Sequence, residues 1–73
     1  MKNYNEILKD LREDHDYTQQ QIAEILKTSQ AQIWKYESGK QELPLRHLKT
    51  LCILYKVSAD YVLGLPKGLK YRE

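Results

Sequence analysis

Cysteine is nearly absent from this sequence, since Cys52 is the only one in 73 residues. A single cysteine excludes an internal disulfide, and the histidines His15 and His47 stand without the Cys/His spacing of a zinc site. No apolar run approaches the ~20 residues needed to cross a bilayer, and the first residues lack an apolar secretion core. We therefore expect a cytoplasmic chain that uses no disulfide, metal or membrane anchor.

Catalytic constellations are also missing. The sequence offers no nucleophile triad, no metal cluster and no glycine-rich phosphate loop. Carboxylates flank His15, but this segment is interpreted as a linker, with His15 and His47 both solvated, and Cys52 is interpreted as a packing residue. Because so short a chain can hardly enclose a cleft, we expect no enzyme activity, no cofactor and no small-molecule ligand.

Apolar residues recur at three- and four-residue intervals, which is the helix period, and no segment alternates as a strand does. The pattern predicts an all-α, compact five-helix bundle over residues 1–65, followed by a short tail at 66–73. The first helix is expected at about 4–14, and the second begins after Thr18. The third begins after Ser29 and ends at about Ser38, where Gly39 suits the left-handed end of a helix. Pro44 opens the fourth in its first turn, and a fifth lies between Ser58 and Gly64.

Three of these helices begin with a capping-box sequence. In this motif the first side chain accepts a hydrogen bond from a backbone N–H three residues on, and that residue's side chain returns the bond. The predicted boxes are Asn3 with Glu6, Thr18 with Gln21, and Ser29 with Gln32.

The second and third helices are separated by only a few residues, too few for an antiparallel pair. Such helices cross at a steep angle, as in a helix-turn-helix. Ala23 supplies the small side chain that a close crossing requires, and Ile33 and Tyr36 face it from the third helix.

The outer face of the third helix is polar. At 100° per residue, Ile33 and Tyr36 point inward with Glu37 beside them. Glutamine can pair with adenine, lysine with guanine, and an alanine methyl can touch the thymine methyl, so this face suits the major groove of DNA. Its members are Gln30, Ala31, Trp34, Lys35 and Ser38.

At these spacings the sequence resembles the phage Cro/repressor-like, or Xre-like, helix-turn-helix family of transcriptional regulators. The resemblance extends from about Tyr4 to Leu65 and implies a lambda-repressor-like fold. Two positions depart from the family pattern. Lys27 occupies a turn that prefers glycine, so the turn either keeps a left-handed geometry at a cost of about 1–2 kcal/mol or relaxes. Ser38 stands where asparagine is common, which concerns one phosphate contact and not the fold. The matching segments are Leu8–Arg12, Thr18–Ala23, Ser29–Ile33, Tyr36–Lys40, Leu43–Leu45 and Val57–Tyr61.

The resemblance implies base contacts at Gln30, Ala31 and Lys35, to which Gln32 is added as a fourth. It also implies a structural ion pair between Arg12 and Glu37. Phosphate contacts are expected at Gln19, where a helix N-terminus attracts anions, and at four further residues. These are Trp34, Ser38, Lys40 and Arg46, with Gln41 beside them.

One such domain covers few base pairs, so we expect a homodimer on double-stranded DNA at a near-palindromic operator. We expect it to act as a repressor, with activation as the open alternative. Late apolar residues either form the dimer contact or complete the core; they are Tyr55, Tyr61, Leu63 and Leu65. An antitoxin or protein-interaction module with the same fold is the alternative. The polar outer face and the short basic tail favour DNA binding.

Overall fold

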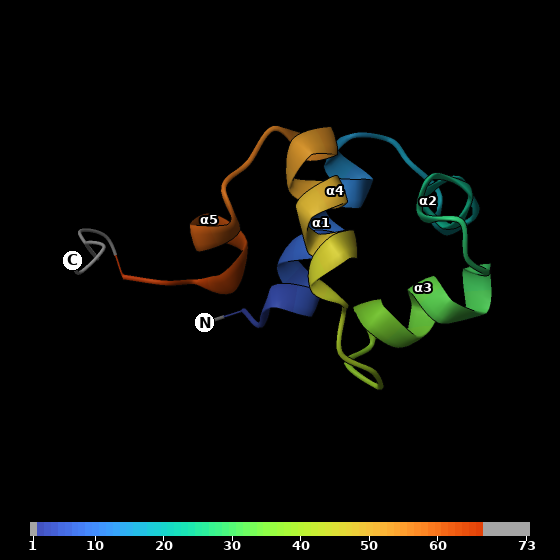
Figure 1. The fold of residues 1–73 in the computed structure, drawn as a ribbon, viewed down its shortest axis with the longest axis horizontal. Helices are drawn as coiled ribbons and strands as arrows, with labels where there is room; N and C mark the ends of the chain where they lie inside the picture. The colour runs from blue at the N-terminus through green and yellow to red at the C-terminus, as the bar shows by residue number, and fades with distance from the viewer. Residues whose placement is uncertain (1, 67–73) are drawn as a thin grey trace.

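The chain forms five α-helices joined by short connections in a computed structural model that describes residues 2–66 (Figure 1). No strand is present within that range, so the predicted all-α, five-helix architecture is confirmed. No helix in residues 2–66 is long and apolar enough to cross a membrane. The predicted tail lies outside the described residues except for Pro66. The helices are α1 (Tyr4–Asp14), α2 (Gln19–Leu26), α3 (Gln30–Glu37), α4 (Leu45–Tyr55) and α5 (Ala59–Leu63).

The predicted capping boxes form to different extents. At α2 both halves are present: the Gln21 backbone N–H donates to Thr18 Oγ1 at 3.1 Å, and the Thr18 N–H donates to Gln21 Oε1 at 2.8 Å. At α3 the prediction is only half right. Ser29 Oγ accepts from the Gln32 N–H at 3.1 Å, but the Gln32 side chain donates to Gln41 Oε1 at 2.8 Å instead of returning the bond.

The start of α4 also differs from the prediction. Pro44 has φ −61° and ψ 148°, so it is the extended residue before the helix rather than part of the first turn. Its carbonyl still accepts the first helical hydrogen bond, from the Leu48 N–H at 3.0 Å. The fixed φ of proline suits this position as well, because an extended residue before a helix has the same φ range.

The core lies where all five helices meet. Ala23 and Val62 have no exposed surface, so α2 contributes the close contact that a steep crossing requires and α5 covers the other end. Figure 1 shows α2 end-on and α3 lengthwise, which confirms the predicted crossing. Tyr55, one of the candidate dimer contacts, is only 4% exposed and belongs to this core. The other core residues are Leu8, Leu11, Ile22, Leu26, Ile33, Tyr36, Leu48 and Leu51.

Cys52 packs against this core from the inner side of α4. Its side chain is partly buried, and burial raises the pKa of the thiol. A thiol with a raised pKa holds less of the nucleophilic thiolate at neutral pH, which supports a packing role.

The turn between α2 and α3 keeps the left-handed geometry that the family sequence pattern implies. Lys27, at the end of α2, has φ 58° and ψ 48°. The Thr28 N–H then bonds to the Ala23 carbonyl at 2.8 Å and closes the helix. A side chain with a Cβ is strained in this conformation, by about 1–2 kcal/mol.

Replacing Lys27 with glycine is therefore expected to stabilise the fold. The relief of strain exceeds the extra chain entropy of glycine in the unfolded state, which costs about 0.4–1 kcal/mol. We expect a gain of about 0.5–1 kcal/mol, seen as a melting temperature higher by about 2–8 °C in a circular dichroism melt. The matched control is Lys49→Gly inside α4, which should lose about 1 kcal/mol. Equal losses for both variants would contradict the strain at Lys27.

Candidate nucleic-acid interface

Helix α3 presents one buried and one exposed face. Ile33 and Tyr36 are 2% and 7% exposed and anchor the helix in the core. The opposite face points to solvent, as the helical spacing predicts. The exposed residues on this face are Gln30, Ala31, Trp34, Lys35 and Ser38.

A buried hydrogen-bond network fixes α3 to the helices behind it. The Glu37 carboxylate accepts from Arg12 Nε at 2.7 Å and from Arg12 Nη2 at 3.1 Å, a two-point contact. Arg12 Nη1 also donates to the Tyr17 carbonyl at 2.8 Å. The hydrogen bond to Glu37 raises the pKa of Arg12, so the guanidinium stays charged. The charges are thus paired where both side chains are nearly covered, 11% and 10% exposed.

Gln19 joins the same network from the first turn of α2. Its amide nitrogen donates to Glu37 Oε1 at 2.9 Å, and the residue is partly buried. This bond holds Gln19 against the Glu37 side of α3, at a helix N-terminus that favours anions. Arg12, Glu37 and Gln19 thereby tie three helices together at one point.

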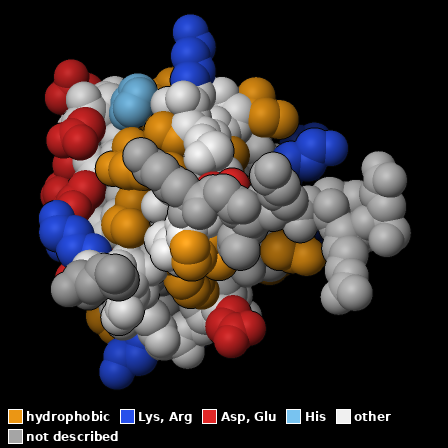
Figure 2. Space-filling model, turned by 90° about the vertical axis from the view of Figure 1, so that its left-hand side faces the viewer, with side chains coloured by type: hydrophobic (Ala, Val, Ile, Leu, Met, Phe, Trp, Pro, Cys, Tyr) orange, Lys and Arg blue, Asp and Glu red, His pale blue; other side chains and the backbone are white. Residues whose placement is uncertain are grey.

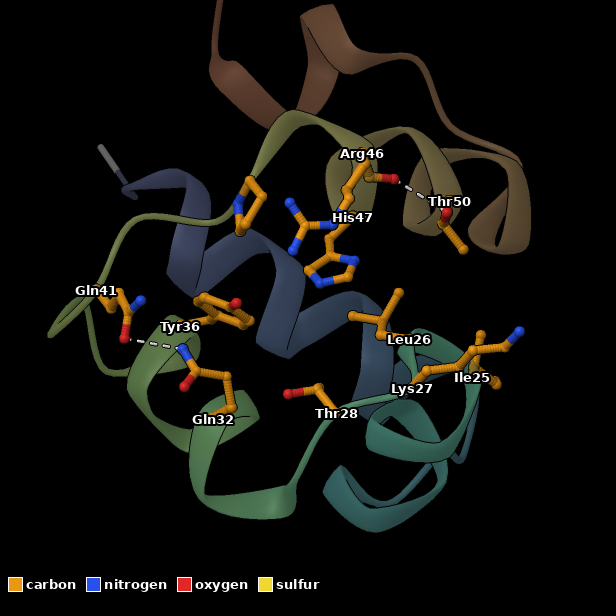
Figure 3. A pocket seen from close by; sticks show the side chains of 11 residues that line it. Ile25, Leu26, Lys27, Thr28, Gln32, Tyr36, Gln41, Arg46, His47 and Thr50 are labelled. Carbon is orange, nitrogen blue, oxygen red and sulfur yellow. Dashed lines mark hydrogen bonds between the residues drawn. The ribbon is translucent and has the colours of Figure 1, made fainter.

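A hollow of about 660 Å³ flanks the other side of α3, between the end of α2 and the start of α4 (Figure 3). Lys27 and Arg46 bring positive charge to its wall, and no carboxylate lines it. Gln32 lies on this flank, partly buried and bonded to Gln41, away from the centre of the exposed face. The hollow is therefore electropositive and opens beside the polar face.

His47 departs from the prediction that it is solvated. It is partly buried, and its ring lies 6.1 Å from that of Tyr36, measured between centroids. Burial, and secondarily the charge of Arg46, lowers the pKa of His47. The charged form of this imidazole is thus disfavoured, and Lys27 and Arg46 carry the positive charge of the hollow. His15 is exposed as predicted, with its ring 5.0 Å from that of Tyr55.

The segment after α3 carries the remaining predicted contacts. Gly39 has φ 78°, and this left-handed residue turns the backbone at the end of the helix. The Lys40 N–H bonds to the Lys35 carbonyl at 2.9 Å, and Ser38 Oγ to the same carbonyl at 3.3 Å. Both Ser38 and Lys40 are exposed.

Two residues of α1 position this segment, and sequence reasoning missed both. The Tyr4 hydroxyl accepts from the Leu43 N–H at 3.2 Å, and Asn5 Nδ2 donates to the Glu37 carbonyl at 3.1 Å. A polar residue in the first turn of a helix is ordinary, so the sequence carries no signal for these bonds. They attach the α3–α4 connection to the scaffold.

The chain is similar to curated regulatory proteins. It is 39% identical over 62 residues to the uncharacterized HTH-type transcriptional regulator YobD of Bacillus subtilis, with 85% of this chain and 55% of YobD covered. It is 38% identical over 61 residues to the HTH-type transcriptional activator BcrR of Enterococcus faecalis, covering 84% of this chain and 30% of BcrR. The chain thus spans about half of one relative and under a third of the other.

A helix-turn-helix family model matches residues 8–62, which include the whole α2–α3 unit. The match agrees with the steep crossing at Ala23, the left-handed turn at Lys27 and the exposed outer face of α3. The chain belongs to the helix-turn-helix family of the Cro/C1, or Xre-like, type.

Proposed function

We propose that this chain binds double-stranded DNA sequence-specifically and regulates transcription in the cytoplasm, by inserting α3 into the major groove. The observation that carries the proposal is the division of α3 into a buried anchor and an exposed polar face. Ile33, Tyr36 and the Glu37 network hold the helix rigidly, so its outer side chains are positioned before DNA arrives. A major groove about 12 Å wide admits one such helix.

Base recognition is assigned to the N-terminal and central part of the exposed face. Gln30 offers an amide for adenine N6 and N7, and Lys35 offers an ammonium group for guanine O6 or N7. Ala31 supplies a methyl between them. Gln32 is placed at the margin of this set, because its amide is bonded to Gln41.

Phosphate contacts are assigned to two flanks of α3, which suits a groove bounded by two strands. One flank is assigned to Gln19, held by Glu37 at the start of α2, and to the indole N–H of Trp34 on the outer face of α3. The other flank is assigned to Arg46, which lines the electropositive hollow, and to Lys40, whose neighbour Gln41 lines it as well, with Ser38 between the flanks. Such contacts fix orientation and carry no sequence information themselves.

We propose a homodimer, with the contact at the α5 end of the molecule. Figure 2 views this end and shows apolar side chains exposed among charged ones. Tyr61 is 59% exposed, and Leu63 and Leu65 are each 44% exposed. Two copies would place two α3 helices on half-sites about 34–36 Å apart, on a near-palindromic operator.

The proposed regulatory outcome is repression, by a dimer that covers the promoter and excludes polymerase. The name of BcrR gives that relative the opposite role, activation. A reporter gene placed behind the bound site tests the direction. Lower expression with the protein present supports repression, and higher expression assigns activation.

Selection of bound duplexes from a random DNA library tests the proposed function. The expected result is enrichment of one near-palindromic sequence with half-sites about one helical turn apart. A library that emerges without an enriched sequence would contradict sequence-specific binding. An enriched sequence without symmetry would contradict the dimer alone.

Replacing Lys35 with alanine is expected to weaken binding to the selected site by about 1–3 kcal/mol and to relax the preference at one base pair. The physical reason is loss of a donor to one base edge in the groove. Fluorescence anisotropy on the site and its single-base variants measures this. Lys9→Ala, an exposed lysine of α1, is the control and should change little. An equal loss on every duplex would reassign Lys35 to phosphate contact.

A further inference from the structure

Trp34 is an unusual residue to find on the outer face of α3. It is 51% exposed and lies among residues assigned to DNA. Within residues 2–66 its indole N–H has no hydrogen-bond partner and its ring pairs with no other aromatic ring. Burying a large aromatic surface is favourable, and an indole that stays in water does not gain this free energy. The side chain is thus available to a ligand that offers an apolar contact.

The helix geometry brings Trp34 next to Ala31. At 100° per residue, Trp34 lies about 40° around the helix from Gln30 and about 60° from Ala31. Long side chains on a helix lean toward its N-terminus, so the indole covers the turn that holds both residues. The Trp34 ring and the Ala31 methyl together form one surface, which we call the apolar wall.

In the major groove only one group complements such a wall. Guanine, adenine and cytosine present acceptors and donors there, whereas thymine adds a 5-methyl group. A polar base edge covered by the apolar wall would lose its hydrogen bonds to water and gain none from the protein, which costs free energy. A thymine methyl would instead be buried with gain.

We propose that Trp34, together with Ala31, is a specificity-determining residue that selects a thymine in each half-site through its 5-methyl group. This rests on the proposed function, because it requires α3 to lie in the groove. It extends the role of Trp34 beyond the phosphate contact of the indole N–H. The ring face and the N–H make separate contributions, so they can be tested separately.

Two variants separate the ring from the N–H. Trp34→Phe keeps an aromatic ring and removes the N–H, whereas Trp34→Gln keeps an N–H donor and removes the ring. Trp34 is half-exposed, so both variants are expected to fold, and circular dichroism verifies this before DNA is added.

The test uses the duplex selected from the random library, in which each thymine is replaced in turn by deoxyuridine. This change removes only the methyl group. The wild-type chain is expected to lose about fourfold in affinity at one thymine per half-site. Trp34→Phe should keep most of this loss, and Trp34→Gln should show none. Lys35→Ala is the control and should retain the methyl effect.

Three outcomes would overturn the inference. First, the wild-type chain binds the site but its affinity does not change with any deoxyuridine substitution, which shows that it does not recognise a thymine methyl group. Second, the Trp34→Gln variant loses as much affinity on deoxyuridine substitution as the wild-type chain does, which shows that another residue contacts the thymine methyl group. Third, the Trp34→Phe variant loses affinity equally on all duplexes and shows no methyl effect. Trp34 would then contribute only the phosphate contact of its indole N–H. Failure to bind any selected duplex would instead refute the proposed function, and the inference with it.

Discussion

Replacing Arg12 with alanine is expected to lower the free energy of unfolding by about 3–5 kcal/mol. The substitution leaves the Glu37 carboxylate nearly covered and without its counter-charge. It also removes the donor to the Tyr17 carbonyl. A domain of this size has only about 5–15 kcal/mol of stability in total, so much of the chain would be unfolded at modest temperature.

Urea unfolding followed by circular dichroism measures this loss without DNA. Glu37→Gln is the partner variant and should also destabilise strongly, because it leaves the Arg12 charge unpaired. Lys2→Ala is the matched control, since the Lys2–Asp10 pair is exposed and exposed pairs contribute little. If Arg12→Ala and Lys2→Ala unfold at the same urea concentration, the network does not hold α3 in place.

DNA affinity is expected to fall steeply with salt. Each phosphate neutralised releases counterions and adds about 0.9 to the slope of log affinity against log salt concentration. Lys40 and Arg46 in both copies of a dimer give four such contacts and a slope of about −3.6. Raising the salt fourfold should therefore weaken binding about 150-fold. Anisotropy titrations on the selected duplex at several salt concentrations provide the slope.

The variant Lys40→Ala tests whether Lys40 contributes to this salt dependence. It removes one contact per copy and should reduce the slope by about 1.8, equally on all sequences. Lys9→Ala, exposed on α1, should leave the slope unchanged. An affinity that does not depend on salt would exclude Lys40 and Arg46 as phosphate contacts. A normal slope in Lys40→Ala would exclude Lys40 alone.

The fold was predictable because its signals are local. Thr18 with Gln21, and Ser58, mark helix starts by hydrogen bonds within three residues of sequence. The inward position of Ile33 and Tyr36 follows from the helical period. Lys27 had two open outcomes, a strained left-handed turn or a relaxed one, and only the backbone geometry decides between them.

The flank formed by α4 was not predictable, since it depends on how distant segments meet. Gln32 satisfies its amide with Gln41 because the α3–α4 connection folds back beside it. His47 is covered because the start of α4 lies over Tyr36. Tyr55 was ambiguous between core and dimer contact for the same reason, and it lies in the core. Helical spacing predicts the direction in which a side chain points from the axis of its own helix. It does not predict which other element the side chain meets.

The residues on the exposed face of α3 could be predicted from the sequence, but not all of the hydrogen bonds that hold this helix in place could. The pattern identified Gln30, Ala31 and Lys35, and the family resemblance suggested the Arg12–Glu37 pair. The bond from Gln19 to the same carboxylate has no sequence signal, because glutamine in a first helical turn is usually solvated. This bond links the proposed phosphate contact to the position of α3.

The most direct test of the account is a nuclear magnetic resonance titration of the ¹⁵N-labelled chain with its selected duplex. Amide signals of Gln19, of residues 30–35 and of Lys40 are expected to shift, while those of residues 7–10 in α1 stay near their free positions. Shifts confined to α5, around Tyr61 and Leu63, with α3 unchanged would contradict the assignment of α3 as the DNA-binding element.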